Sequence, residues 1–485
     1  MELMLICTLL PLLSGAALLF VNIPARKTRM ACALAAVTLT SLACLYTVFS
    51  GASGEAAFAL MRVGPGLELR WRLDGCGRVY LAVAALLWPF SVLYAVDYMR
   101  HEKRVSRFFA WYILTYAAAA ALAFSDNLFT LYVNYEFLTL LTVPLVWHEK
   151  DEESTRAVKI YMLFLLGGAA LGFVAMMGLS ALGLGAFDAG AAAEKSAFGV
   201  LRVLALLGFL GFGVKAAVLP LCRWLPTASV APTPVTALLH AVAVVNAGVF
   251  AVARLLYCVI PSAAVRGSWA QTAMLALAAA TVVYGSAMAV REQHMKRRLA
   301  WSTVSNLSYM LFGLCLLTRD GATAGLAHMV FHSMTKIILF FCAGSVLTQT
   351  GRTQIRQMHG LGRSLPLTFS AFTLAGLSLV GVPPLAGFVS KYALVTAALS
   401  LGGTEAWLGA VALILSAVLT AVYVFTVVFP AFFMKPVLPE GEPVREGGAC
   451  MRLSLLLLCL VLLLGSVFAG RIMAYLTALG EVLLP

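Results

Sequence analysis

Long apolar runs with almost no charged residues recur from Leu3 nearly to the C-terminus, and they constrain the fold more than any other feature of the sequence. Each run covers roughly 18 to 25 residues, enough for an α-helix to cross a hydrocarbon core of about 30 Å. The runs are continuous, without the apolar and polar alternation that the strands of an outer-membrane barrel show. They predict about fourteen transmembrane helices. The predicted centres lie near positions 12, 40, 88, 116, 137, 170, 208, 246, 279, 308, 335, 382, 418 and 460.

The composition indicates the same class of protein. Hydrophobic residues make up 62% of the chain and charged residues only 11%, a balance that soluble domains do not show. The longest gaps between apolar runs are Ser50–Cys76, Gly185–Ser196 and Met434–Met451, and each predicts a loop rather than a separate domain. We therefore predict an all-α polytopic membrane protein.

The basic residues predict how the helices are oriented, because lysine and arginine gather in short loops on the cytoplasmic side of a membrane. Here the basic groups follow odd-numbered spans, so both termini are predicted to face outward. The first run begins Met-Glu-Leu-Met without a basic leader, and we interpret it as a retained span rather than a cleaved signal. The formal net charge of +13 is assigned to these inner loops and to anionic lipid, not to nucleic acid. The groups are Arg26/Lys27/Arg29, Arg100/Lys103/Arg104/Arg107, Lys150/Arg156/Lys159, Arg291/Lys296/Arg297/Arg298 and Arg352/Arg356/Arg363.

The ten cysteines do not follow the pattern of a metal or redox site. They include no C-x-x-C pair, and iron–sulfur clusters need several thiolates at close spacing. We interpret those in apolar runs as small core residues and expect this chain to bind no metal or redox cofactor of its own. In a redox machine the electrons would then travel in another subunit. The cysteines in apolar runs are Cys7, Cys32, Cys44, Cys258, Cys315, Cys342 and Cys459.

Ionisable residues inside predicted spans are the candidate functional residues, because they are costly to bury in a membrane. A single glutamate at such a place could also lie near the interface or form a structural pair with a lysine. The candidates are Glu136, Lys215, His240, His328, His332, Lys336 and Lys391.

Lys215 lies deep in an apolar run that is followed by four prolines. Pro220 cannot donate a backbone hydrogen bond and clashes with the carbonyl of residue 216, so the helix is predicted to break within about one turn of the lysine. Pro226, Pro232 and Pro234 keep the following stretch irregular. Irregular backbone at membrane depth requires protein or water to satisfy it, which predicts a hydrated cavity beside Lys215. A pair between Glu136 and Lys215 is our hypothesis for its control.

His328, His332 and Lys336 are spaced four residues apart and therefore share one face of a helix. Two imidazoles followed by an ammonium form a row suited to passing a proton through bound water. Haem is a weaker alternative, because neighbours on one helix cannot approach a haem from opposite sides and His240 would have to supply the second ligand. Zinc is weaker still, since no acidic or cysteine ligand accompanies the pair.

A second interruption lies in the run that precedes Lys391, at Gly381, Pro383, Pro384 and Gly387. The two interrupted runs are the seventh and twelfth spans, and an odd offset of five gives them opposite orientations. This is typical of an inverted repeat with a site near the midplane. The chain is accordingly divided into N-terminal transmembrane helices (1–105), a first five-helix repeat with Glu136, Lys215 and His240 (106–260), a second inverted repeat with His328, His332, Lys336 and Lys391 (261–432), and a loop with a C-terminal transmembrane helix (433–485).

Over residues 75–430 the order of these segments resembles the antiporter-like subunits of respiratory complex I, a family that includes membrane-bound hydrogenases and Mrp-type sodium/proton antiporters. The resemblance implies fourteen helices with two inverted five-helix repeats, each containing a broken helix. The segments are NYEFLTLLTVPL, GFGVKAAVLPLCRWLPTASVAPTPVTALLHA, KRRLAWSTVSNLSYMLFG, HMVFHSMTKIILFFCAGSV and LSLVGVPPLAGFVSKYAL.

The resemblance also implies a role for each candidate. Glu136 and Lys215 match the family's coupling pair, and Lys391 matches the lysine of the exit half-channel. His240 and the face formed by His328, His332 and Lys336 match the central relay. Many relatives carry a lysine where this chain has Asn246, and His240 is expected to replace it. The chain runs only a short way past its last predicted span, without the long lateral helix of the distal complex I subunit, which favours a middle-type subunit in a bacterial cytoplasmic membrane.

Three functions follow as alternatives. The first is a proton-pumping subunit of a redox complex, complex I-like or an energy-converting hydrogenase, whose partner subunits carry iron–sulfur clusters, nickel–iron or flavin. The second is a subunit of an Mrp-type Na⁺/H⁺ antiporter without redox chemistry. The third is a membrane scaffold that transports nothing. Other membrane subunits, H⁺ and anionic lipid are the expected partners, and Na⁺ stays open because the carbonyls freed at the helix breaks are oxygen ligands.

Overall fold

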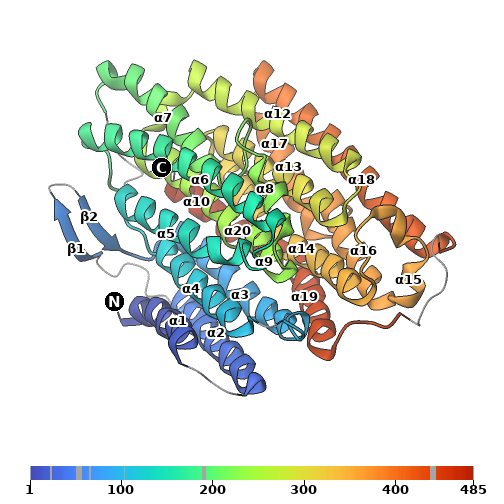
Figure 1. The fold of residues 1–485 in the computed structure, drawn as a ribbon. Helices are drawn as coiled ribbons and strands as arrows, with labels where there is room; N and C mark the ends of the chain where they lie inside the picture. The colour runs from blue at the N-terminus through green and yellow to red at the C-terminus, as the bar shows by residue number, and fades with distance from the viewer. Residues whose placement is uncertain are drawn as a thin grey trace.

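Long helices packed side by side form almost the whole molecule (Figure 1). The structure is a computed structural model of the 485-residue chain, and it describes every residue except 1, 22–24, 51–56, 65–66, 103, 188–192, 437–443 and 484–485. The helices and strands of the first half are α1 (Glu2–Phe20), α2 (Arg26–Phe49), β1 (Phe58–Gly64), β2 (Leu67–Trp71), α3 (Gly75–Tyr98), α4 (Val105–Ala123), α5 (Leu128–Val146), α6 (Glu152–Ala181), η1 (Lys195–Ala197), α7 (Phe198–Gly213), α8 (Trp224–Thr227), η2 (Ala228–Val230), α9 (Thr233–Ala241) and α10 (Val244–Arg254). Those of the second half are η3 (Leu255–Val259), α11 (Ser262–Val265), α12 (Trp269–Arg291), α13 (Met295–Cys315), α14 (Arg319–Thr350), η4 (Ile355–Met358), α15 (Leu361–Ser364), α16 (Pro366–Val380), α17 (Ala386–Leu401), α18 (Thr404–Phe433), α19 (Ala449–Val467) and α20 (Ala469–Leu483).

The predicted helical membrane fold is confirmed in its main feature. Within the described ranges, twelve helices are long and apolar enough to cross a membrane. Each predicted centre lies in a helix except the one near 382, which falls between the shorter apolar helices α16 and α17. The count of about fourteen spans and the inverted repeat stay predictions.

The helix bundle has two ends that differ in structure and charge. The hairpin end carries β1 and β2, the start of α3 and the end of α2; the opposite, basic end carries the start of α2 and the turn after α3. At the basic end the Arg29 guanidinium donates a hydrogen bond to the Ser106 hydroxyl across 2.7 Å. Assignment of the basic end to the cytoplasm rests on the basic loops and stays a prediction.

The segment Ser50–Cys76 was expected to be a loop, and that expectation is wrong for residues 58–71, which contain two short strands. Strands β1 and β2 form an antiparallel hairpin in which Arg62 pairs with Glu68, and their side chains are 2.6 Å apart. The turn between α4 and α5 anchors the hairpin, because the Asn127 side chain donates to the Glu68 carbonyl at 2.8 Å. Outside the long helices these backbone groups need partners, and pairing two short strands supplies them.

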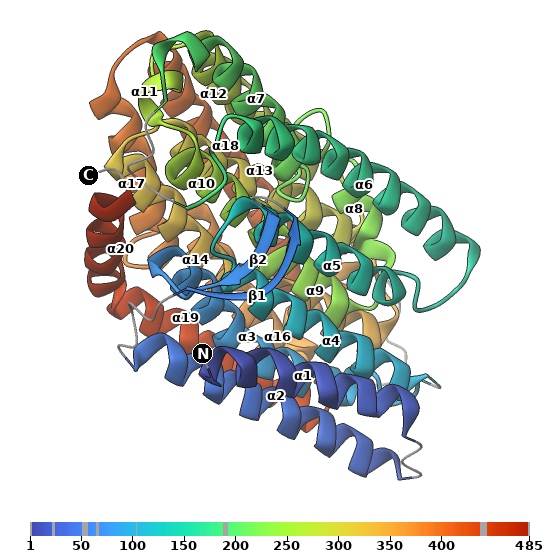
Figure 2. The same cartoon turned by 90° about the vertical axis from the view of Figure 1, so that its left-hand side faces the viewer.

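A second difference is at the C-terminal end, where one transmembrane helix was expected. A single turn residue, Phe468, separates α19 from a further helix, α20. The Thr323 hydroxyl donates to the Leu476 carbonyl at 3.2 Å, which places α20 against the start of α14. Figure 2 shows α20 lying across the hairpin end rather than along the long helices. Its short, interrupted apolar pattern explains why no separate helix was predicted.

Some residues differ from their expected setting. Lys296 and Arg298, which the topology argument placed in a basic loop, lie in the first turn of α13 and are buried. The Arg298 guanidinium donates to the Thr426 hydroxyl at 2.8 Å and to the Tyr423 carbonyl at 3.1 Å, which explains its burial. Among the cysteines expected in the core, Cys32 is exposed and Cys459 is partly buried, because each lies on the outer face of its helix.

Candidate functional site

The two predicted helix breaks are present and lie beside the two lysines. Helix α7 ends at Gly213, and turns replace it from Val214 to Arg223, where Lys215 is fully buried. Helix α16 ends at Val380 and α17 begins at Ala386, one turn before Lys391. Proline supplies the physical reason at both places, since it removes a backbone donor inside an apolar run.

Protein side chains satisfy the backbone groups freed at the first break. The Tyr135 hydroxyl donates to the Phe212 carbonyl at 2.8 Å, and the Trp224 indole donates to the Val214 carbonyl at 2.8 Å. The Thr281 hydroxyl accepts from the Leu219 amide at 3.0 Å. These contacts allow irregular backbone at this depth, and the hydrated cavity expected beside Lys215 stays a prediction.

Lys215 is held by its neighbour Tyr135 on α5 rather than by a carboxylate. Its ammonium donates to the Tyr135 carbonyl and lies 3.4 Å from the centre of the Tyr135 ring. Glu136 follows directly on α5 and is partly buried, and its Oε1 atom has no hydrogen-bond partner in the described part of the chain. The structure therefore places Lys215 against the residue that precedes Glu136, and the contacts of its ammonium among the described residues are with Tyr135.

A third break, which the sequence did not reveal, lies next to His240. Helix α9 ends at Ala241 and α10 begins at Val244, with no proline or glycine between them. The Tyr80 hydroxyl donates to the Ala243 carbonyl at 3.0 Å, and the Asn246 amide donates to the Ala241 carbonyl at 3.0 Å. Tertiary hydrogen bonds thus replace the helical ones, and no local sequence signal announces them.

His240 and Asn246 connect this break to neighbouring elements in two directions. The His240 Nε2 atom lies 3.5 Å from the Ser229 hydroxyl, and its ring packs against Phe340 of α14 at 4.7 Å between centroids. The Asn246 amide donates to the Ser333 hydroxyl of α14 at 2.9 Å. His240 is therefore placed between Ser229 and the helix that carries the other two histidines.

The face of α14 formed by His328, His332 and Lys336 is buried as the four-residue spacing predicts. The Lys336 ammonium donates to the Leu299 carbonyl of α13 at 2.9 Å and to the Ser302 hydroxyl. The centroids of the two imidazoles are 5.9 Å apart. Both ring nitrogens of His332 are buried without a hydrogen-bond partner among the described residues.

Lys391 and His328 close the row at the second break. The Lys391 ammonium donates to the Leu379 carbonyl at 2.6 Å, so the lysine satisfies the end of the broken helix α16. His328 contacts the Ser390 hydroxyl through Nδ1 at 2.9 Å and the Asn306 side-chain oxygen through Nε2 at 3.2 Å. Ser390, the residue directly before Lys391, therefore links Lys391 to His328.

Small polar residues complete the row, and sequence reasoning missed them. They come from η2, α10, α13, α14 and α17, and none is charged. Polar residues at four-residue spacing in KRRLAWSTVSNLSYMLFG were the available signal, because Ser302 and Asn306 share one face of α13. The residues are Ser229, Asn246, Ser302, Asn306, Ser333 and Ser390.

A polar pocket of about 320 Å³ opens at the basic end and reaches Ser229. Its lining includes Glu149, Glu153, His294 and the buried Lys296, whose ammonium donates to the Ala231 carbonyl at 2.7 Å. Burial, together with nearby Glu102 and Asp151, raises the pKa of Glu149 above its ordinary value. The pocket therefore leads from acidic groups at the surface to the residue that contacts His240.

Both ring nitrogens of His328 are occupied, which argues against this residue as a metal or haem ligand. They contact Asn306 and Ser390, and His332 lies on the same helix. Within the described ranges, the three side chains with metal-ligand geometry are Glu102, His148 and Glu149, whose ligand atoms lie within 4.8 Å of one another at the basic end. These three residues include none of the seven candidates. The His148 Nε2 atom lies 3.7 Å from a Glu102 carboxylate oxygen, which is an ion-pair distance.

Comparison with known proteins identifies the family. A family model described as "NADH:quinone oxidoreductase/Mrp antiporter, TM" matches residues 125–420. NADH-quinone oxidoreductase subunit L of Mycobacterium tuberculosis (strain ATCC 25618 / H37Rv) is 33% identical over 420 residues, which are 85% of this chain and 64% of that protein. NADH-quinone oxidoreductase subunit N of Desulforudis audaxviator (strain MP104C) is 31% identical over 423 residues, which are 84% of this chain and 82% of that protein. The chain thus spans 64% of the length of the first relative.

Solved structures show the same fold. Respiratory complex I from Thermus thermophilus has a chain with a TM-score of 0.84 and 26% identity, with 99% of each chain covered. The archaeal membrane-bound sulfane sulfur reductase has one with a TM-score of 0.86 and 23% identity, covering 100% of this chain and 98% of that one. The Mrp complex from Dietzia sp. DQ12-45-1b has a chain with a TM-score of 0.81 and 22% identity, covering 100% of each chain. This multi-pass membrane protein therefore belongs to the family of antiporter-like membrane subunits shared by NADH:quinone oxidoreductases and Mrp antiporters.

Proposed function

We propose that this chain is the proton-translocating, antiporter-like subunit of a redox-driven membrane complex. One observation carries the proposal: six buried ionisable side chains and a partly buried glutamate lie in the interior of one bundle, beside three helix breaks and on one face of α14. Ionisable groups are costly at membrane depth, and in transporters they mark ion routes. A scaffold would need none of them, so their burial argues against that alternative.

The proposed route begins at the pocket at the basic end. Glu149 collects protons there, because its raised pKa favours its protonated form. Ser229 links the pocket to His240. From His240 the proton passes to the face of α14 at Lys336 and His332. The unpartnered nitrogens of His332 support a water-bridged step, because buried polar groups in proteins are almost always satisfied by protein or ordered water.

The second half of the route leads through His328 and Ser390 to Lys391. His328 contacts the Ser390 hydroxyl, and Lys391 bonds the carbonyls that end α16. A proton that reaches Lys391 leaves beside the break, where irregular backbone provides further acceptors. The proposed direction is from the basic end towards the hairpin end, with the basic end in the cytoplasm and both termini outside.

Glu136 and Lys215 form the proposed control element. In this structure the Lys215 ammonium bonds the Tyr135 carbonyl, and Glu136 Oε1 has no partner among the described residues. Bringing the carboxylate to the ammonium would stabilise the charged lysine, and separating them would favour its release of a proton. A neighbouring subunit would set this distance, which couples its conformational change to the row beyond Lys215.

The relatives favour a redox complex over an Mrp antiporter. Those at or above 30% identity include subunits L and N of NADH-quinone oxidoreductases and subunit L of an F(420)H(2) dehydrogenase. The Mrp chain, at 22% identity, shows the fold alone. We propose that partner subunits in a bacterial cytoplasmic membrane carry the iron–sulfur, flavin or nickel–iron chemistry, and that this chain carries protons only.

The test combines purification with transport. The tagged chain is isolated from its native membrane in mild detergent, its partners are identified by mass spectrometry, and the complex is reconstituted into vesicles with an internal pH dye. Lys336→Ala is compared with Lys435→Ala, which removes an exposed lysine after α18. We expect redox subunits among the partners and loss of proton movement in Lys336→Ala only. Transport at the wild-type rate in Lys336→Ala would contradict the route, and small antiporter subunits alone would make the chain an exchanger.

A further inference from the structure

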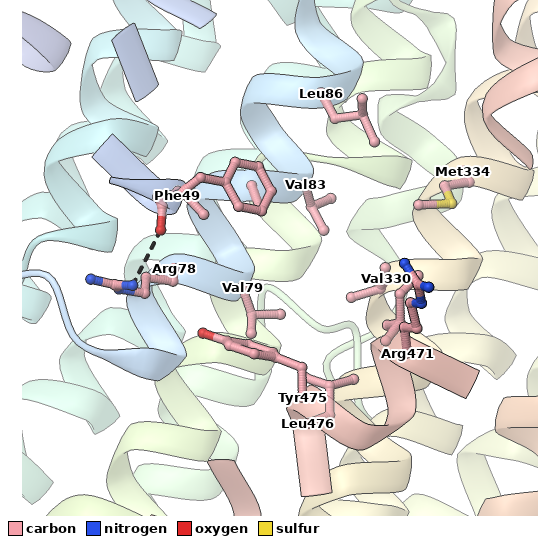
Figure 3. Close-up of a pocket in the computed structure, with 13 residues that line it drawn as sticks. Phe49, Arg78, Val79, Val83, Leu86, Val330, Met334, Arg471, Tyr475 and Leu476 are labelled. Carbon is pink, nitrogen blue, oxygen red and sulfur yellow. Dashed lines mark hydrogen bonds between the residues drawn. The ribbon is translucent and has the colours of Figure 1, made fainter. Parts of the chain in front are cut away.

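A groove on the outer surface of the bundle is separate from the proton route (Figure 3). It has a volume of about 510 Å³, and its lining comes from α2, α3, α14 and α20. Apart from the two arginines at its edges and the hydroxyl of Tyr475, the side chains that line it are apolar. They are Val48, Phe49, Arg78, Val79, Ala82, Val83, Leu86, Val330, Met334, Arg471, Ile472, Tyr475 and Leu476.

The groove has the depth of one lipid leaflet. Arg78 lies in the first turn of α3, at the hairpin end, and Leu86 is the deepest lining residue on that helix. Eight residues at a rise of 1.5 Å each separate them by about 12 Å. Half of a hydrocarbon core of about 30 Å is about 15 Å. The apolar slot therefore runs from the membrane surface nearly to the midplane.

The two arginines flank the groove from opposite sides, with Val79, Val83 and Tyr475 between them (Figure 3). One Arg78 nitrogen donates to the Val48 carbonyl at 3.2 Å. Its Nε and second terminal nitrogen are buried without a partner in the described part of the chain. Arg471 is exposed on α20. No acidic residue belongs to the described lining, and the nearby Asp74 carboxylate is already paired with Arg254.

Helix α20 gives the groove an interfacial edge. Its buried residues Ala469, Leu476 and Leu479 face the bundle, whereas Arg471 and Tyr475 face outward. An amphipathic helix of this kind lies in the plane of the membrane surface, and tyrosine and arginine are typical of the headgroup region. The position of α20 across the end of the bundle in Figure 2 fits this arrangement.

We propose that this groove binds one anionic phospholipid of the leaflet at the hairpin end. Arg78 and Arg471 hold the headgroup phosphate, because guanidinium groups pair with phosphate through charge-assisted hydrogen bonds. An acyl chain fills the slot along Val79, Val83 and Leu86. The acyl chain then contacts Val330 and Met334 of α14. The same helix carries His328, His332 and Lys336.

Native mass spectrometry tests the site without any transport measurement. The complex containing the tagged chain is stripped of lipid and titrated with phosphatidylglycerol or phosphatidylcholine. We expect the wild type to retain phosphatidylglycerol preferentially and the Arg78→Gln/Arg471→Gln variant to bind it about tenfold or more weakly, since a hydrogen bond to a charged group contributes about 1.5–3 kcal/mol. Arg452→Gln, which removes an exposed arginine at the basic end of α19, is the matched control and should bind as the wild type does.

A second variant tests the apolar slot. Ala82 is a partly buried lining residue, so Ala82→Phe fills the slot and leaves both arginines in place. It too should weaken retention of phosphatidylglycerol. Equal retention in the wild type and the double-arginine variant would overturn the proposal, and so would equal retention of the two lipids. A cross-link from a cysteine at Ala82 to a partner subunit, with no lipid retained, would assign the groove to that subunit instead. Failure here leaves the proton route untouched, because the binding assay does not depend on transport.

Discussion

Gly248 of α10 packs directly on the interrupted segment that holds Lys215. A Cβ atom at this position would lie 2.5 Å from the Ala216 amide nitrogen and 2.9 Å from the Lys215 Cβ atom. Ordinary contacts between carbon atoms are about 3.5–4.0 Å. Gly248→Ala therefore forces α10 and the Lys215 segment apart by about 1 Å, and backbone rather than a flexible side chain has to move.

The expected cost follows from two opposing effects. Overpacking a well-packed interior costs about 1–3 kcal/mol, whereas alanine is favoured over glycine in a helix by about 1 kcal/mol. Gly167→Ala isolates the helix-propensity effect from the overpacking effect, because Gly167 also lies inside a helix but has open space where its Cβ would be. Gly248→Ala should therefore be about 1–3 kcal/mol less stable than Gly167→Ala.

Thermal unfolding in detergent and proton uptake into vesicles measure the two consequences. The Gly248→Ala protein should melt below both the wild type and Gly167→Ala. A displacement of about 1 Å at Lys215 should lower proton movement by up to about 100-fold, as misplacement of reacting groups does in enzymes. Melting at the temperature of Gly167→Ala together with full transport would refute the contact geometry around Lys215.

Two further predictions concern the ends of the bundle. At the hairpin end the buried Arg254 guanidinium forms two hydrogen bonds with Asp74. Arg254→Met should therefore lower the free energy of unfolding by about 3 kcal/mol, which is the lower end for a broken buried pair because the Asp74 side chain is 30% exposed. An unchanged melting temperature would contradict this. At the basic end burial and nearby Arg297 lower the pKa of His294 to about 4 from 6.5. Neutral His294 therefore adds stability above about pH 6.5 that is lost as the pH falls towards 4, because the unfolded chain binds the proton first. His294→Gln should flatten the fall in melting temperature over this range, and an unchanged slope would contradict the assignment.

Much of the architecture could be predicted from local signals. Apolar length located the helices, and prolines located the breaks beside Lys215 and Lys391. The four-residue spacing of His328, His332 and Lys336 placed them on one buried face. These predictions succeeded because a membrane leaves few alternatives: its core excludes unpaired backbone groups, so a long apolar run must form a helix and an interruption must lie inside protein.

Other features depended on contacts between distant segments. The break at Ala243 is stabilised by Tyr80, 163 positions away in the chain, and has no proline or glycine to announce it. Lys296 looked like one more basic loop residue until α13 buried it beside Ala231.

The sequence by itself determined a helical membrane protein, its interrupted helices, its family resemblance and the seven ionisable residues that are costly to bury. Only the tertiary structure decided which groups those residues touch: Tyr135 rather than Glu136 for Lys215, Ser229 for His240, and Ser390 with Asn306 for His328. It also revealed the pocket at the basic end and the arginine-flanked groove at the hairpin end. The physical reason is that burial cost can be estimated from one residue and its neighbours, whereas a hydrogen bond or a cavity requires several segments to meet.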